Sequence, residues 1–244
     1  MSAVAEKVNA RKVTVVTRAG MVRGVHMDPR ALYDDEQSLV FRSLYPIGLE
    51  AFVQNPSVAM EKDIADHLFQ AEHLLVLMSD GSFKFGGGEI GTPRPIGFCV
   101  WYTYNMPIGR AVYISGVCVN PSWQGKGLGK AMQQYAISYA QLQGEPVSYA
   151  FMSTQNAVEK KSFDDALGKE SYPHTDGTVL EIGAEFAAIR GAKNYDAGTM
   201  RLVRHYGGAS LYGMLPVCTD ERYEQFFKGI AREEGDAYLC VAEV

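Results

Sequence analysis

The fold is decided by the stretch Val117-Cys118-Val119-Asn120-Pro121-Ser122-Trp123-Gln124-Gly125-Lys126-Gly127-Leu128-Gly129-Lys130. It predicts a strand that ends in a glycine-rich turn, and the turn opens directly into a helix. Glycines at alternate positions let the backbone come close to a ligand. The first N–H groups of the helix have no intrahelical partners, and the positive end of the helix dipole lies beside them. This geometry predicts an anion site that suits a pyrophosphate.

The glycine spacing excludes the two commonest phosphate-binding motifs. A dinucleotide-binding turn needs Gly-x-Gly-x-x-Gly, and Lys130 occupies the last of these positions when the count starts at Gly125. A P-loop needs Gly-x-x-x-x-Gly-Lys-Ser/Thr, and Lys130 stands where its second glycine belongs. The pattern that fits is Gln-x-x-Gly-x-Gly, filled by Gln124, Gly127 and Gly129. A Val-x-Pro precedes it, and the apolar helix face that follows consists of Leu128, Met132, Tyr135 and Tyr139.

With these features the segment resembles the acetyl-CoA-binding segment of the GCN5-related N-acetyltransferase (GNAT) superfamily. The resemblance implies an α/β (α+β) fold with a mixed, mostly antiparallel central sheet flanked by helices. It covers roughly residues 13–168 and is strongest over 95–168. It implies a single acyl-CoA N-acyltransferase-like domain over residues 1–244 with a longer C-terminal region, in which residues 169–198 form an insertion. A tight strand-to-helix turn that binds nothing is the alternative, and the joint agreement of all these features argues against it.

The resemblance also implies which residues bind the acyl donor. Backbone groups of Val117 and Val119 would contact the pantetheine arm, and a backbone N–H near Cys118 would polarise the thioester carbonyl. Asn156 matches the family's amide that contacts pantetheine, although an ordinary helix cap is the alternative. The pyrophosphate would accept hydrogen bonds from the backbone N–H groups of Gln124, Gly125, Lys126, Gly127, Leu128, Gly129 and Lys130.

Two positions depart from the family pattern. The thiolate-protonating tyrosine lies seven residues after the asparagine, and Phe163 stands there, whose ring has no proton to give. Water, Tyr149 or Tyr172 are the alternative donors. The glutamate base of the histone-acetylating branch is replaced by Tyr113. The ordinary pKa of tyrosine, near 10, is too high for direct base catalysis at pH 7, so Tyr113 either orders a water or the amine in the acceptor channel or packs as a strand residue.

Composition narrows the class of protein further. The chain has 244 residues, 47% of them hydrophobic, which is ample for a sizeable core. The net charge of -5 and the absence of a Lys/Arg run argue against nucleic acid as the main partner. No run of apolar residues is long enough to span a bilayer, and residues 1–12 lack a signal-peptide core, so we expect a soluble, cytoplasmic protein without a membrane partner.

The cysteines and histidines show no metal-ligand spacing, so we expect no bound metal. Buried free thiols are the expected state of Cys99, Cys118, Cys218 and Cys240. Each of the five histidines is expected at the surface or as a satisfied core residue.

The expected activity is transfer of an acetyl group from acetyl-CoA to the amine of a small molecule or peptide, directly and in a ternary complex. The Phe163 and Tyr113 departures leave a catalytically weak CoA-binding sensor as the alternative. An acyltransferase with a different acyl donor or acceptor is a third hypothesis. By resemblance the acceptor is set by the first two helices, within residues 34–70, and by the last strands. A monomer and a homodimer both stay open.

Hydrophobic periodicity and turn residues predict the remaining elements. A helix over residues 34–45 should end at Pro46. Residues 79–82 and 86–88 form turns or a mobile loop, either a hairpin tip or a substrate lid. The other predicted helices cover residues 56–73, 127–143, 156–167, 180–190 and 220–234. The predicted strands cover residues 12–17, 74–78, 95–104, 111–119, 147–152, 200–206 and 237–242.

Overall fold

The computed structural model describes residues 10–51, 64–65, 68–79, 84–85, 88–89, 93–107, 109–154, 157–171, 195–196, 201–206, 209–215 and 237–244. The chain divides into two compact units. The first unit consists of Met1–Tyr102 and Ile114–Ser138, and the second of Thr103–Tyr113 and Tyr139–Val244. The expectation of one domain over residues 1–244 stays a prediction.

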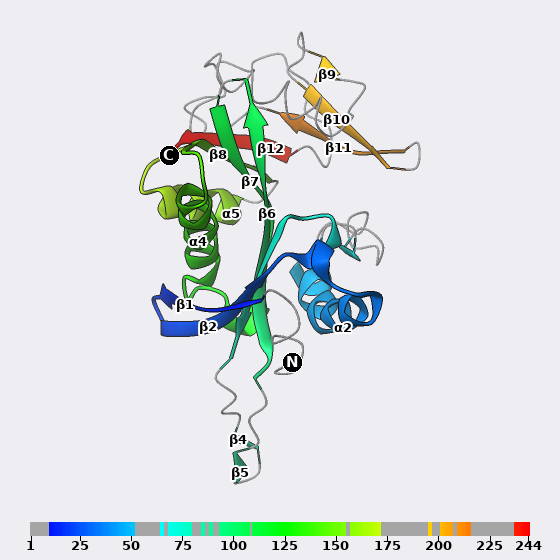
Figure 1. The fold of residues 1–244 in the computed structure, drawn as a ribbon, viewed down its shortest axis with the longest axis vertical. Helices are drawn as coiled ribbons and strands as arrows, with labels where there is room; N and C mark the ends of the chain where they lie inside the picture. Colours follow the sequence, from blue (N-terminus) through cyan, green and yellow to red (C-terminus); the bar gives the residue numbers. More distant parts are fainter. Residues whose placement is uncertain are drawn as a thin grey trace. The chain divides into compact units, whose positions relative to one another are not determined.

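The first unit is built on antiparallel strands. Its strands follow the order β1-β2-β3-β6-β7, with β2 paired to β1 and to β3, and β3 paired to β6, all antiparallel. Two helices belong to this unit: α2 (Asp34–Ala51) and α4 (Leu128–Leu142) as far as Ser138. They lie on opposite sides of the strands (Figure 1). The elements are β1 (Arg11–Thr17), β2 (Gly20–Met27), the short 3-10 turn η1 (Pro29–Ala31), α2 (Asp34–Ala51), β3 (His73–Met78), β6 (Pro95–Met106), β7 (Gly109–Val119), the 3-10 turn η2 (Pro121–Trp123) and α4 (Leu128–Leu142).

β3 shows why this part of the chain folds. Five of its six side chains are buried, because the strand lies between β2 and β6 and is covered on both faces. Leu74, Leu75 and Leu77 are each 0% exposed, as is Met132, which α4 contributes. Burying one such side chain stabilises the fold by roughly 1.5 to 3 kcal/mol. The core of the first unit therefore lies on both faces of β3.

The prediction that the helix beginning at Asp34 ends before Pro46 is wrong. α2 continues to Ala51, with Pro46 inside it. Pro46 is exposed, so the carbonyl that loses its N–H partner can bond to water. Leu44 and Ile47, on either side of the proline, are 1% and 4% exposed. Their burial outweighs the missing hydrogen bond.

The second unit is built on a mixed set of strands. Its strands follow the order β6-β7-β8-β12-β11-β10-β9, in which β12 is antiparallel to β8 and parallel to β11. The sheet is therefore mixed and mostly antiparallel, as predicted. The elements not yet bounded are β8 (Val147–Thr154), α5 (Ala157–Leu167), β9 (Tyr195–Asp196), β10 (Arg201–Tyr206), β11 (Ala209–Leu215) and β12 (Ala237–Glu243).

Most of the other predicted elements are confirmed within a few residues. β2, β9 and β11 were not predicted. β4 (Lys84–Phe85) and β5 (Gly88–Glu89) pair as a separate two-stranded hairpin, which agrees with a hairpin tip and leaves the lid hypothesis a prediction. Cys99, Cys118 and Cys240 are buried free thiols, as expected. The helices predicted over 180–190 and 220–234, most of the 169–198 insertion and Cys218 lie outside the described residues, as does most of the helix predicted over 56–73.

Candidate functional site

The end of β7 is held against β6 by a close backbone approach. The N–H of Asn120 donates to the carbonyl of Ile96 at 2.9 Å. A Cβ on Gly97 would lie 2.8 Å from the carbonyl oxygen of Cys118, so this position of β6 requires glycine. Cys118 is buried, whereas Val117 and Val119 are half-buried. The two residues predicted to contact pantetheine thus share the more open side of a strand whose end is fixed.

Hydrogen bonds hold the turn that follows β7. Asn120 Oδ1 accepts the N–H of Ser122 at 3.0 Å, and the N–H of Gln124 donates to the carbonyl of Pro121 at 3.2 Å. The side chain of Gln124 turns back and donates from Nε2 to the carbonyl of Val119 at 3.2 Å. The glutamine of the sequence motif therefore ties the turn to the strand that precedes it.

The helix begins immediately after Gly127. The carbonyl of Gly127 accepts the N–H of Ala131 at 3.1 Å, which makes Gly127 the residue that precedes the first turn of α4. Its φ of 79° is a left-handed conformation that favours glycine. The N–H groups of Leu128, Gly129 and Lys130 accordingly have no acceptor inside the helix. Together with the helix dipole they form a set of donors for an anion.

Three cationic residues lie near the start of α4. Lys126 and Lys130 flank the helix start in the sequence, and Lys126 Nζ lies 4.1 Å from the centroid of the Trp123 ring. Arg18 comes from the turn between β1 and β2: a Cβ on Gly127 would lie 3.3 Å from Arg18 Cγ. Arg18 was not predicted as a site residue, because only the hairpin places it beside the turn. Three cationic residues near amides that have no acceptor inside the helix favour a polyanionic ligand.

Tyr113, the predicted acceptor-side residue, belongs to the second unit and is 2% exposed. Its ring stacks on Phe151 of β8, with 4.9 Å between the centroids and 24° between the planes. The ring of Tyr104, from β6, is also stacked on the ring of Tyr113, with 6.3 Å between the two centroids. This aromatic packing fixes the ring of Tyr113; the role predicted for its hydroxyl stays a prediction.

The beginning of α5 carries a carboxyl that sequence reasoning missed. Thr154, the last residue of β8, donates from Oγ1 to Oε2 of Glu159 at 2.6 Å. Burial raises the pKa of the Glu159 carboxyl to about 7, although the hydrogen bond from Thr154 opposes this shift. Phe163, one helical turn further, is 0% exposed. Asn156 and Tyr172 lie outside the described residues.

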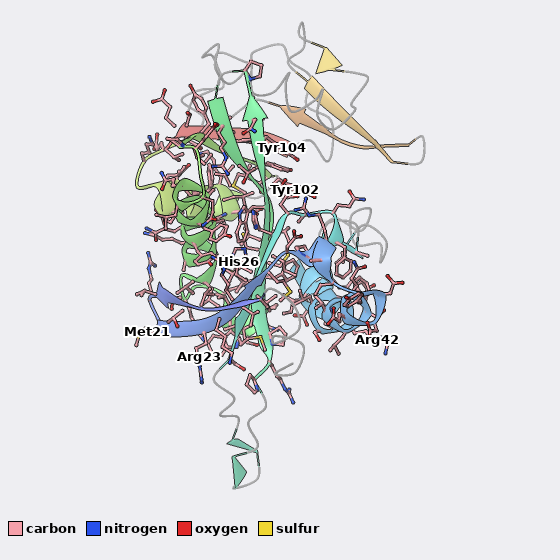
Figure 2. All side chains as sticks on the ribbon, in the orientation of Figure 1. Met21, Arg23, His26, Arg42, Tyr102 and Tyr104 are labelled. Carbon is pink, nitrogen blue, oxygen red and sulfur yellow. The ribbon has the colours of Figure 1, made fainter. Side chains whose placement is uncertain are left out.

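A buried histidine lies in the first unit (Figure 2). His26 is 4% exposed; its Nδ1 lies 3.1 Å from the hydroxyl of Tyr135, and its Nε2 lies 3.3 Å from Nδ1 of His73. The Trp101 ring packs against it at 4.9 Å between centroids. Burial, with the nearby His73, lowers the pKa of His26 to about 4, so it is neutral at pH 7. This is the satisfied core histidine that the sequence suggested.

The model of the Acetyltransferase (GNAT) family matches residues 42–161, which include β6, β7, the glycine-rich turn, α4 and β8. This segment of the chain belongs to the GNAT family. Membership of this acetyltransferase family places the protein, in broad terms, among enzymes of acyl transfer. No curated protein matches the chain in sequence.

Solved structures similar to this GNAT chain are distant in sequence. A putative arylalkylamine N-acetyltransferase 7 from the yellow fever mosquito is 11% identical, covers 96% of this chain and 93% of its own, and has a TM-score of 0.46. The GNAT domain of S. lividans PAT is 15% identical over 68% of this chain and 91% of its own, with a TM-score of 0.46. Aminoglycoside N-acetyltransferase AAC(6')-Iy in complex with CoA is 17% identical over 57% and 87%, with a TM-score of 0.38.

The described residues offer neither a metal-binding cluster nor a membrane-spanning helix. Within those residues, no group of three or more His, Cys, Asp or Glu side chains is placed to hold a metal ion. Nor is any helix of the described ranges long and apolar enough to cross a membrane.

Proposed function

We propose that the protein transfers the acetyl group of acetyl-CoA to an amine of a small molecule or peptide, directly and in a ternary complex. The observation that carries the proposal is the turn from Gln124 to Lys130. Its unpaired N–H groups and neighbouring cations match the pyrophosphate of CoA, in the position where the family binds it. The amine nitrogen attacks the thioester carbonyl, the C–N bond forms, the C–S bond breaks, and CoA leaves as a thiolate. No covalent intermediate with the enzyme is needed.

Each part of the donor has a proposed partner. The backbone of Val117 and Val119 holds the pantetheine arm, and a backbone N–H near Cys118 polarises the thioester carbonyl, which stabilises the charge that develops there. Asn156 adds an amide contact to pantetheine. The buried Tyr113 contributes its hydroxyl to ordering the amine or a water on the acceptor side, and does not lose its proton near neutral pH.

Acetyl-CoA binding is the first test. Titration calorimetry should detect binding to the wild type, and Arg18→Gln should weaken it because one of the three cations at the turn is removed. Arg42, an exposed arginine of α2 labelled in Figure 2, provides the charge-matched control. Arg42→Gln should leave the affinity unchanged. If the two variants behave alike, the turn is not the site of the phosphates.

Turnover is the second test, and it separates this proposal from a CoA sensor. The sensor is favoured by one observation, the buried phenyl ring of Phe163 where the family has a proton donor. The purified protein is incubated with acetyl-CoA and a panel of amines while free thiol is measured. Thiol release that depends on the amine supports transfer. Binding without release with every amine supports the sensor, and release only with another thioester assigns a different acyl donor.

A further inference from the structure

The tip of the β1–β2 hairpin lies against the start of α4, and both belong to the first unit. Thr17 pairs with Gly20, so Arg18 and Ala19 form a two-residue turn. The Thr17 hydroxyl holds this turn, because Oγ1 donates to the carbonyl of Gly20 at 2.9 Å and accepts the N–H of Ala19 at 3.0 Å. A Cβ on Gly127 would lie 3.4 Å from the backbone nitrogen of Arg18 and 3.3 Å from its Cγ. A segment from far earlier in the sequence therefore borders the proposed donor site.

The charged end of Arg18 is not the part that contacts Gly127. The atoms beside Gly127 are the backbone nitrogen and Cγ of Arg18, and the guanidinium carbon follows Cγ only after Cδ and Nε. Arg18 is exposed, so its guanidinium is accessible to a ligand. A guanidinium carries five N–H donors in a planar fork, which matches two oxygens of one phosphate. Arg18 thus offers a phosphate-binding group beside the N–H groups of α4 and separate from them.

The other two cations near the turn are placed differently. Nζ of Lys126 lies over the Trp123 ring, 4.1 Å from its centroid. Lys130 belongs to the first turn of α4, whose N–H groups are the proposed partners of the pyrophosphate. CoA carries one more phosphate, on the 3′ carbon of its ribose, and the function proposed above gives that phosphate no partner. Arg18 is the cation that comes from outside both the turn and the helix.

We propose that Arg18 binds the 3′-phosphate of the acyl donor, so that the protein selects thioesters of CoA over thioesters of dephospho-CoA. This inference rests on the proposed acetyl transfer and specifies the donor of the same site. A phosphate monoester carries about −1.5 to −2 charge at neutral pH and has three strong acceptor oxygens. Two of these oxygens suit the fork of an arginine, whereas the N–H groups at a helix start suit the pyrophosphate. Selection follows because dephospho-CoA has a hydroxyl in place of the 3′-phosphate.

The principal test compares two ligands, acetyl-CoA and acetyl-dephospho-CoA, by titration calorimetry on the wild type and on Arg18→Gln. The substitution should weaken acetyl-CoA binding about 5 to 10 fold, as expected for a charge-assisted pair that stays accessible to water. It should change the affinity for acetyl-dephospho-CoA by less than about twofold, because the group that Arg18 binds is missing. Equal losses for the two ligands overturn the proposal, since they assign the guanidinium to the pyrophosphate.

Two further variants separate a direct contact from a general effect of charge. Arg18→Lys keeps the charge and removes the fork, so it should recover only part of the acetyl-CoA affinity and bind acetyl-dephospho-CoA as the wild type does. Lys12→Gln, at an exposed lysine of β1 away from the hairpin tip, is the charge-matched control. It should change neither affinity by more than about twofold, because distant exposed charges are screened by salt. If Lys12→Gln reproduces the loss seen in Arg18→Gln, the contact is refuted.

Turnover supplies a second readout of the role of Arg18. The 3′-phosphate takes no part in the bonds that form and break, so Arg18→Gln should raise KM for acetyl-CoA and leave kcat within about twofold of the wild type. A lower kcat with an unchanged KM contradicts the proposal.

The wild type keeps this outcome apart from that of the proposed function. If the wild type binds neither ligand, the use of acetyl-CoA is refuted, and the proposed function with it. If the wild type binds both ligands equally well, only the role of Arg18 is refuted.

Discussion

The neutral, buried His26 makes the folded state sensitive to acid. Its pKa is lowered from 6.5 to about 4 by burial and by the neighbouring His73 and Arg11. Between these two values the unfolded chain binds a proton that the folded chain does not. The free energy of unfolding therefore falls as the pH falls from 6.5 towards 4. Well above pH 6.5 the histidine is neutral in both states and has no effect on the free energy of unfolding.

The two pKa values of His26 determine how much the free energy of unfolding falls. The proton-linkage relation gives a loss of about 2 kcal/mol between pH 7 and pH 5, which approaches about 3 kcal/mol at pH 4. This is a large share of the stability of an ordinary domain. In His26→Gln the group whose pKa is lowered by burial is gone, so this part of the pH dependence should vanish, whatever the variant costs in packing at pH 7.

Urea unfolding of wild type and variant, each at pH 7 and pH 5, measures the difference directly. The wild type should lose about 2 kcal/mol more than His26→Gln over this interval. His73→Gln should show a smaller loss than the wild type, because removing His73 takes away one cause of the lowered pKa of His26. Equal losses in the wild type and His26→Gln would refute the reasoning.

Three further predictions concern the site. Gly127→Ala and Gly125→Ala both place a side chain at a positive φ, 79° and 73°, and should each lower the free energy of unfolding by about 1 kcal/mol. Gly127→Glu, whose side chain would lie next to the first amides of α4, should abolish acetyl-CoA binding in calorimetry, and wild-type affinity would contradict this. Gly97→Ala should lower the free energy of unfolding in urea by roughly 1 to 3 kcal/mol, because its Cβ would lie 2.8 Å from a backbone oxygen; Gly48→Ala, whose nearest contact is 3.4 Å, should change it by less than about 1 kcal/mol. Tyr113→Phe should slow transfer about 10 to 100 fold with acetyl-CoA binding retained, and unchanged kinetics would remove its hydroxyl from the mechanism.

The elements around the turn were predictable because their signals are local. Gly125, Gly127 and the Gln-x-x-Gly-x-Gly spacing identify a strand, a turn and a helix start within fourteen residues. The same holds for α5, which ends at Leu167 before a glycine with a φ of 73°. Such patterns depend on backbone conformation and on helical periodicity, both of which adjacent residues decide.

The errors in the predicted helices and strands have a different origin. Pro46 was predicted to end a helix, and α2 continues because buried neighbours on the same helix outweigh a hydrogen bond that only the exposed face loses. β2 was missed although it alternates from Val22 to His26, because its burial depends on β1 and β3 on either side. Packing against distant residues decided both cases.

The sequence by itself determined the family, the glycine-rich turn and the absence of the usual tyrosine at Phe163, since each is a matter of residue type and spacing. Only the tertiary structure decided that Arg18 lies beside Gly127, that His73 and Tyr135 enclose His26, and that Thr154 holds Glu159. The physical reason is burial. Whether a histidine or a glutamate carries a proton at neutral pH depends on the water and the charges around it. Around His26 these come from segments that lie far apart in the sequence, and around Glu159 they depend on how a strand packs against a helix, which local sequence patterns do not predict.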